Sequence, residues 1–357
     1  MISMKRVMLM LAALMIAMPL MAGNASSWEQ ISNPIIKPAD WQQIVNESPF
    51  SLGEAEGFTV PDEGGGYNQL SYSTYPSLDG STVSVPMAVE FARQHLGLPE
   101  MDLAALATFS TTHQAYENLI LKKPNGAPLL PFSNAVMDSE QPVNLIIVTP
   151  PSQEEQALAD ENGVSLVMKP VCHDAFIFIV HADNPVNSLT VEQIRGIYSG
   201  DITNWAEVGG EDAAIKPYQR NPNSGSQTAM ENLVMQGEVM SARSRPFIIS
   251  FGMSALVSSI GSYRNDPVGI GYTYQFYLTQ LVESDAVKAV AVGGIEPTPE
   301  NVQSGKYPFA TSYYGVIRGG EEEQSGGLFL DWMLTEEGQK CIAQAGYIPL
   351  NASEGMK

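Results

Sequence analysis

The segment "AFIFIVHADNPVNSLTVEQIRGIYSG" (Ala175–Gly200) carries the pattern that decides the fold class. Its first six residues, Ala175–Val180, are all apolar, which is typical of a strand buried on both faces of a sheet. A polar turn follows, and Thr190 with Gln193 then forms a capping box at the start of a helical pattern. Gly200 is suited to the end of that helix. A buried strand followed by a capped helix predicts an α/β fold.

The same alternation extends to both sides of this segment. An apolar strand is predicted at Val143–Val148, followed by a helix from about Ser152 to Asp160. Further upstream, Pro86 suits the first turn of a helix that should end near Gly97. Because strands and helices alternate along the chain, we expect largely parallel sheets.

Length and charge limit the classes of function. A chain of 357 residues suits two lobes, each with its own core. Acidic residues outnumber basic ones by 39 to 18, so the formal charge is −21. This charge argues against nucleic acid or an anionic membrane surface as a partner, since both require a basic face. A small anion is still compatible, because a binding site is local and net charge is not.

The N-terminal region has the features of an exported protein. Lys5 and Arg6 precede an apolar run from Val7 to about Met21, and small residues follow. This pattern predicts a secretory signal peptide over residues 1–25, since the run is short for a membrane span of about 20 residues. We expect the mature protein in the periplasm or outside the cell, without a lipid-anchored cysteine. Residues 26–69 are predicted to form an arm or linker.

The cysteine and histidine residues give little indication of chemistry. Cys172 and Cys341 could pair in an oxidising compartment, but the sequence does not decide this. The run Cys172-His173-Asp174 is a poor nucleophile–base arrangement, because adjacent strand residues point to opposite faces. No histidine or cysteine spacing is typical of a metal site. His113 lies in a loop rich in hydroxyl groups and could border a cleft.

Three segments share one design: an extended piece, then Ser or Thr, then a helical pattern. They are Asp79–Pro86 ("DGSTVSVP"), Phe109–His113 ("FSTTH") and Arg220–Thr228 ("RNPNSGSQT"). A helix start offers unpaired N–H groups and a partial positive charge, to which hydroxyl groups add donors. Arg220 can add a planar pair of donors suited to an oxyanion. The alternative is that these hydroxyls act only as helix N-caps.

Several motifs in a fixed order resemble the phosphate-binding proteins of ABC importers. They are "NPVNSLTVEQIRGIYSGDITNWAEVGG" (Asn184–Gly210), Arg220 before Ser224-Gly225-Ser226, and "VGIGYTY" (Val268–Tyr274). The resemblance extends over roughly Tyr72 to Leu350. It implies a two-lobed periplasmic-binding-protein fold of type II, with a central cleft and a hinge.

The resemblance also implies lobe boundaries and ligand contacts. Lobe I would comprise residues 70–178 and 276–357, and lobe II residues 179–275. In lobe II, Arg220 would pair with the charge of the anion. The other residues that the resemblance places at the ligand are Ser224, Gly225 and Ser226 from lobe II and, from lobe I, Ser84 with the Val85 amide and Ser110 or Thr111. The turn just before Ser84, with Ser81 and Thr82, is an equally good contributor.

One departure from the family pattern affects the choice of ligand. Relatives carry an Asp after the third strand, which accepts the proton that phosphate retains and repels sulfate. Here Val148 and Thr149 stand at that place. A phosphate O–H left without an acceptor would weaken binding by about 1–3 kcal/mol. Either another acid takes this role, with Asp79 the first candidate, or the ligand is not phosphate. Asp79 could instead cap its own turn.

These observations predict an extracytoplasmic solute-binding protein that captures phosphate or a similar tetrahedral oxyanion for an ABC importer. We expect a monomer whose partner is an ABC permease in the inner membrane, with no enzymatic activity, cofactor or metal. One alternative is a sensor or surface interaction module with the same fold. The other is a secreted hydrolase of phosphoesters.

Overall fold

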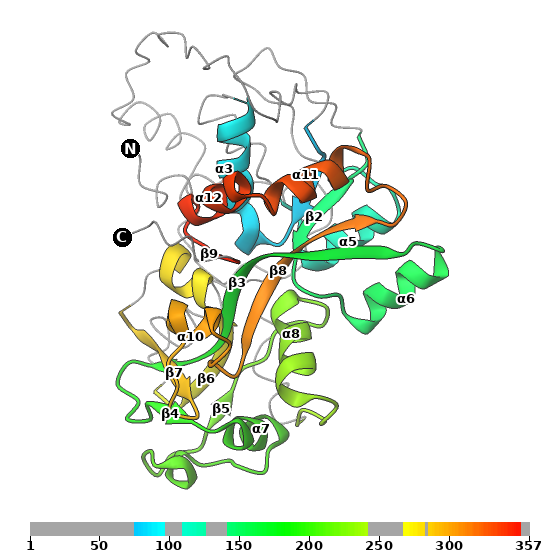
Figure 1. Cartoon of the computed structure of the whole chain (residues 1–357). Coiled ribbons are helices and arrows are strands. Elements are labelled where there is room, and N and C mark those ends of the chain that lie inside the picture. The colour runs from blue at the N-terminus through cyan, green and yellow to red at the C-terminus, as the bar shows by residue number, and fades with distance from the viewer. Residues whose placement is uncertain (1–74, 97–108, 126–140, 242–266, 283–284, 351–357) are drawn as a thin grey trace, which may run out of the picture. The chain divides into compact units, whose positions relative to one another are not determined.

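The computed structural model describes residues 75–96, 109–125, 141–241, 267–282 and 285–350 (Figure 1). The predicted signal peptide (1–25), the predicted arm (26–69) and the predicted helix end at Gly97 lie outside the described residues.

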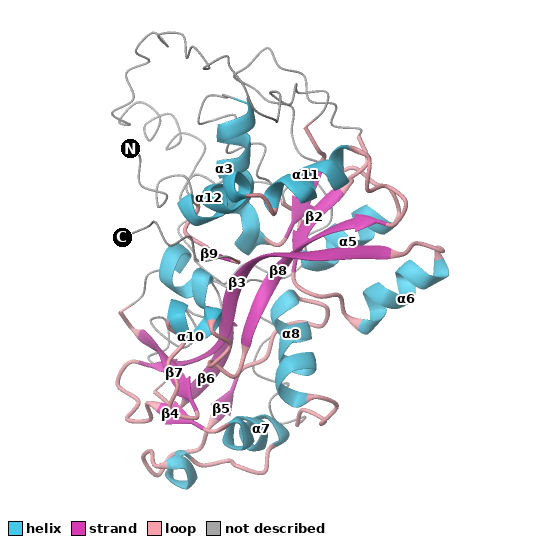
Figure 2. Cartoon of the chain, viewed as in Figure 1, coloured by secondary structure: helices cyan, strands magenta, loops and turns pink. Residues whose placement is uncertain are grey.

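The strand β3 (Leu166–His181) runs through two parts of the sheet (Figure 2). Its residues from Leu166 to Ala175 pair antiparallel with β8 (Ala310–Arg318), with a register shift near Pro170. Its residues from Phe176 onward pair antiparallel with β6 (Gly269–Tyr274). The predicted apolar strand Ala175–Val180 is confirmed, since all six residues are fully buried.

The sheet follows the order β1-β2-β8-β3-β6-β5. The parallel pairs are β1 with β2, β4 with β7 and β5 with β6, whereas every pair that β3 makes is antiparallel. The prediction of largely parallel sheets was therefore wrong. Strands β6, β7, β8 and β9 all pair antiparallel with β3. The alternation of helices and strands in the sequence does not reveal these strand directions. The remaining strands are β1 (Leu78–Gly80), β2 (Leu145–Val148), β4 (Ser188–Leu189), β5 (Lys216–Pro217), β7 (Val287–Val292) and β9 (Ile348–Pro349).

The helices begin where the sequence supplies capping residues. Thr190 and Gln193 form both bonds of the predicted capping box, and Gly200 ends that helix at a φ of 90°. Ser152 and Glu155 form a second capping box. The helices are α3 (Val85–Leu96), α5 (Thr112–Ile120), α6 (Gln153–Glu161), α7 (Val191–Ser199), α8 (Gly225–Ala229, continued by a π-helical turn to Met235), α10 (Pro299–Gln303), α11 (Ser325–Met333) and α12 (Glu336–Gln344), with short 3-10 turns at Thr82–Ser84 and Trp205–Val208 and a π-helical turn at Tyr277–Val282.

The apolar core forms two clusters. In the smaller one, Tyr116 of α5 packs with Ile146 of β2 and Val316 of β8. The larger cluster follows β3 along its length and includes Trp205 and Phe329. Fully burying an apolar side chain such as Phe contributes about 1.5–3 kcal/mol toward folding, so packing along β3 contributes substantially to stability.

The division into lobe I (70–178 and 276–357) and lobe II (179–275) stays a prediction. Strand pairing suggests one change to it. The strand β7 pairs with residues Phe178–His181 of β3 and with β4, so we propose that it belongs with lobe II.

Asp174 is buried near the point where the pairing of β3 with β8 ends and its pairing with β6 begins. Its Oδ1 accepts hydrogen bonds from Ala175 N (2.7 Å) and from Phe276 N (3.2 Å). Burial raises the pKa of Asp174 from 3.8 to about 7, and these two hydrogen bonds only partly oppose the effect. The carboxyl group is therefore protonated in the folded protein over much of the acidic range.

We expect Asp174 to make folding less favourable as the pH rises. Between pH 3.8 and about 7 the folded chain holds a proton that the unfolded chain has lost, so the free energy of unfolding falls through this window. Asp174→Asn keeps an oxygen acceptor and removes the ionisation. The melting temperature of this variant, relative to wild type, should therefore rise from pH 4 to pH 7 and then level off. Asp183→Asn, at a side chain that is 87% exposed, is the control. A constant difference between Asp174→Asn and wild type would contradict the prediction.

Candidate anion-binding site

The three polar segments predicted from the sequence meet at one cavity of about 160 Å³. Thr149, which follows β2, and Tyr274, at the end of β6, also line it. Segments that are far apart in the chain thus share one hollow. The first segment contributes Ser81, Thr82 and Val83, the second Thr111, Thr112 and His113, and the third Arg220, Asn221, Asn223, Ser224, Gly225 and Ser226.

Each segment brings the first turn of a helix to the cavity, and a hydroxyl group caps that turn. Ser81 Oγ accepts from Val83 N at 3.3 Å, just before α3. Thr111 Oγ1 accepts from Gln114 N in α5 at 3.3 Å. Ser224 Oγ accepts from Gln227 N in α8 at 3.2 Å. The N-cap alternative from the sequence is therefore correct, but the same three capping residues also line the cavity.

Gly225 allows the start of α8 to come close to the other segments. A β-carbon added to Gly225 would lie 2.6 Å from Thr149 Oγ1 and 2.9 Å from Thr112 Oγ1. Both distances are shorter than van der Waals contact. The Tyr274 hydroxyl also donates to Gly225 O at 3.2 Å. Only a residue without a side chain fits this position without movement of its neighbours.

Arg220 supplies positive charge to the cavity. Its backbone N donates to Tyr272 Oη (3.0 Å) and to Gln227 Oε1 (3.2 Å), which fixes the chain just before the third loop. Burial lowers the pKa of Arg220, and the nearby Tyr272, Tyr277 and Tyr274 oppose this shift. A guanidinium is still protonated under such conditions. Among the described lining residues, Arg220 is the one with a permanent positive charge.

Three residues predicted to contact the ligand, Asp79, Ser84 and Ser110, are not among the residues that line this cavity. Asp79 is fully buried, and its Oδ1 accepts from Gly80 N (2.7 Å) and Ser110 N (2.8 Å). Its Oδ2 accepts from Ser110 Oγ (2.7 Å) and Asn118 Nδ2 (2.8 Å). Burial raises the pKa of Asp79, while these hydrogen bonds lower it. Asp79 therefore ties the second polar segment to the end of β1 and is not free to accept a ligand proton.

Ser84 is occupied in a similar way. Its Oγ lies 2.7 Å from Ile147 O and 2.8 Å from Ser81 O, and the side chain is fully buried. Like Asp79 and Ser110, it shapes the loops without lining the cavity.

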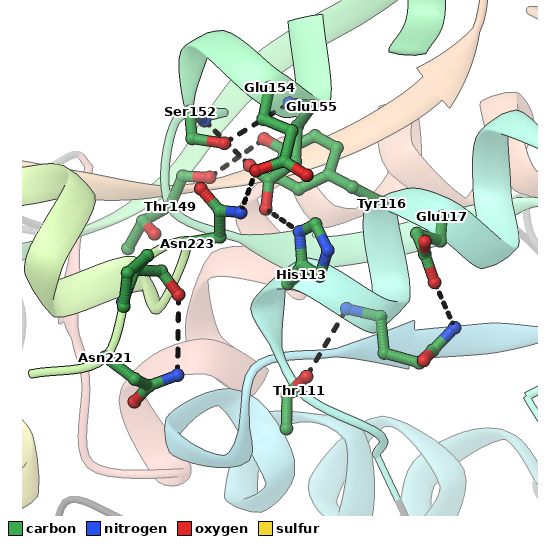
Figure 3. A network of polar contacts seen from close by, with 12 residues as sticks. Thr111, His113, Tyr116, Glu117, Thr149, Ser152, Glu154, Glu155, Asn221 and Asn223 are labelled. Atoms are coloured by element: carbon green, nitrogen blue, oxygen red, sulfur yellow. Dashed lines mark hydrogen bonds and ion pairs between the residues drawn. The ribbon is translucent and has the colours of Figure 1, made fainter. Parts of the chain in front are cut away.

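The structure adds polar contacts at the edge of the site that the sequence did not predict (Figure 3). The Asn223 amide donates to the Glu154 carboxylate of α6, and Asn223 has a φ of 59°, a conformation that Asn tolerates. His113 Nδ1 lies 2.9 Å from Glu155 Oε1. The other oxygen of Glu155 accepts from Ser152 N at 2.7 Å. No sequence motif signals the pairs of Asn223 with Glu154 and of His113 with Glu155, because their members lie 42 or more residues apart.

The two cysteines are not poised for nucleophilic reaction. Burial raises the pKa of the Cys172 thiol well above its ordinary value, which disfavours a nucleophilic thiolate. Cys172 and Cys341 are both buried and are not bonded to each other. The described part of the chain contains no cluster of three or more residues suited to a metal ion.

Comparison with known proteins places this architecture in a family. Residues 100–337 match the family model described as a PBP superfamily domain. The chain belongs to the PBP superfamily. The predicted fold class, a two-lobed α/β periplasmic-binding-protein fold, is thereby confirmed.

Several members of the PBP superfamily are similar to this chain. It is 29% identical over 222 residues to the phosphate-binding protein PstS of Pseudomonas aeruginosa. The matched region covers 57% of this chain and 66% of that protein. It is 30% identical over 175 residues to PstS of Bacillus subtilis, and that match covers 48% of this chain and 53% of the relative. The chain thus spans less than two thirds of the length of these curated relatives.

A solved structure gives the same fold. It is a Clostridium perfringens protein named for phosphate ABC transport and solved with bound phosphate, with a TM-score of 0.56 and 26% identity. The match covers 78% of this chain and 100% of that one. Among the described helices of the present chain, none has the length and apolar character needed to cross a membrane.

We expect Gly225→Ala to destabilise the protein, although alanine favours helices. The added methyl group would overlap Thr149 Oγ1 and Thr112 Oγ1, and overpacking of this kind costs about 1–3 kcal/mol. Urea unfolding would measure the loss.

A double-mutant cycle with Thr149→Ala tests the cause. Removing Oγ1 should recover part of the stability that Gly225→Ala loses. Strictly additive effects of the two substitutions would show that the clash is not the reason.

Proposed function

We propose that this chain is an extracytoplasmic solute-binding protein that captures phosphate or a similar tetrahedral oxyanion and delivers it to an ABC permease. The observation that carries the proposal is the shared cavity, where three capped helix starts and Arg220 meet. The proposal includes binding as a monomer, export through the predicted signal peptide (1–25), and release of the ligand chemically unchanged.

The chemistry of the cavity suits an oxyanion. Its volume of about 160 Å³ exceeds the roughly 30 Å³ that one water molecule occupies in the liquid, so it has room for an anion of five heavy atoms. Backbone N–H groups at helix starts and Ser or Thr hydroxyls can replace the water molecules around such an anion. Arg220 can supply a charge-assisted pair of hydrogen bonds. We therefore assign ligand contacts to Ser81, Thr82, Thr111, Arg220 and Ser224–Ser226.

Closure of two lobes explains how distant segments form one site. If the predicted lobes are correct, Ser81 and Thr111 come from lobe I and Ser224 from lobe II, with β3 passing between them. A hinge motion would then close the cavity around the anion. The contacts of Gly225 with Thr149 and of Asn223 with Glu154 would form in the closed state.

The relatives support phosphate as the first ligand to test. The two PstS proteins are named as phosphate-binding proteins, and the Clostridium perfringens structure contains phosphate. Binding without turnover agrees with the buried, protonated thiol of Cys172, which leaves the hydrolase alternative without that nucleophile.

Phosphate should raise the melting temperature of the protein. At a ligand concentration of 100 times Kd, binding stabilises the folded state by about 2.7 kcal/mol. Differential scanning fluorimetry with phosphate, sulfate, molybdate and a phosphonate would measure the effect. If none of these anions shifts the transition, the proposed function is wrong.

Arg220→Ala should weaken phosphate binding strongly. Loss of a hydrogen bond to a charged group amounts to about 1.5–3 kcal/mol, which corresponds to roughly a 10- to 150-fold increase in Kd. Arg93→Ala is the matched control, because Arg93 lies on α3 with a side chain that is 45% exposed and pairs with Glu90. Isothermal titration calorimetry would compare the two. Similar affinities for both variants would remove Arg220 from the site.

A further inference from the structure

Asp174 lies where two segments of the chain pass between the predicted lobes. In β3, the pairing with β8 ends at Ala175 and the pairing with β6 begins at Phe176. The second segment follows β6, and there the backbone N of Phe276 donates to Asp174 Oδ1 at 3.2 Å. Both predicted lobe boundaries lie close to this contact in the sequence, so the carboxyl group of Asp174 ties the two segments together.

Tyr274 connects Asp174 with the anion-binding cavity. It lines the cavity, its hydroxyl donates to Gly225 O at 3.2 Å, and its side chain interacts electrostatically with Asp174. Its ring packs against Tyr313 of β8, with the two ring centroids 5.5 Å apart. By the predicted boundaries, Tyr274 belongs to lobe II, whereas Tyr313 and Asp174 belong to lobe I. Opening of the lobes would therefore loosen this contact and admit water toward Asp174.

No charge compensates an ionised Asp174 in the observed state. Its Oδ1 accepts the two backbone hydrogen bonds described above, but its buried Oδ2 has no hydrogen-bond partner among the described residues. The ionisable groups that interact with it are Cys172 of β3, Tyr274 of β6, Tyr313 of β8 and Tyr347 before β9. Burial raises the pKa of all four groups, so they stay neutral near pH 7. His173 is next in the strand, where alternate residues point to opposite faces, and burial lowers the pKa of its imidazole.

We propose that the closed, anion-bound protein holds a proton on Asp174 that the open protein releases, so that capture of the anion takes up a proton. This proposal rests on the proposed function, because it requires two lobes that close around an anion. Burial raises the pKa of Asp174 to about 7 in the closed state, and water that enters on opening would lower this pKa toward 3.8. Since the bound state then holds more protons than the free state, affinity for the anion falls as the pH rises through about 7.

The first test counts the protons that the full chain takes up when it binds phosphate. Calorimetric titrations at about pH 6, in two buffers with different ionisation enthalpies, give this number. Phosphate itself changes protonation to the same extent in every variant, so a comparison isolates the protein. Wild type should take up about 0.5 proton or more per bound phosphate beyond the number found for Asp174→Asn. His173→Gln and the exposed Asp183→Asn are the controls, and both should match wild type.

The pH profile of the affinity is the second readout. If the pKa of Asp174 differs by about one unit between the open and closed states, the Kd of wild type, divided by that of Asp174→Asn, should rise about tenfold from pH 5 to pH 8. Equal proton numbers for these two proteins, a constant ratio of their Kd values, or loss of the proton uptake in His173→Gln would overturn the inference and leave the proposed function standing. Failure of wild type to bind phosphate would overturn both.

A measurement on wild type alone covers the case in which Asp174→Asn does not fold. Infrared difference spectra with and without phosphate, at about pH 6, should show a gain of the carbonyl band of a protonated carboxyl group, because binding adds a proton to a buried acid. Binding of phosphate without this gain would contradict proton uptake by Asp174.

Discussion

The antiparallel pairing of β3 with two different neighbours is the constraint on which the rest of the structure depends. One continuous strand of 16 residues joins β8 over its first part and β6 over its second. Every loop of the cavity is positioned relative to this frame. Thr149 follows β2, which pairs with β8, and Tyr274 ends β6. The strands thus place the loops that line the cavity, while Arg220 adds charge and Gly225 allows the close approach of α8.

Capping a helix start and lining the cavity are two uses of the same residues. Ser81, Thr111 and Ser224 each accept a bond from the first turn of a helical segment, and each lines the cavity. A hydroxyl has more hydrogen-bonding capacity than one cap uses, so the two roles do not compete. Asp79 does not line the cavity. It accepts hydrogen bonds from Ser110 and Asn118 and so holds the second loop in place. Under the proposed function, this buried carboxylate would support anion binding without contacting the anion.

Much of this arrangement could be predicted from the sequence, because its signals are local. The apolar run Ala175–Val180, the capping box of Thr190 and the cluster of hydroxyls around Ser224 each depend on neighbouring residues. Strand direction could not be predicted in the same way, because it depends on which distant strands come back against β3. The alternative that Asp79 caps its own turn agrees with the bond from Gly80 N, but its bonds to Ser110 and Asn118 could not be predicted, because those residues are 31 and 39 positions away. The pairs of Glu154 with Asn223 and Glu155 with His113 join residues that no local pattern connects.

The contact between Asn223 and Glu154 has a kinetic consequence. Both side chains lie at the edge of the site, where water can reach them, and they link the loop before α8 to α6. A bond that must break before the two elements separate slows the escape of whatever lies between them, while adding little to the contacts that the captive molecule itself makes. Under the proposed function, this contact would affect how long an anion stays bound, whereas the residues lining the cavity would decide which anion is recognised.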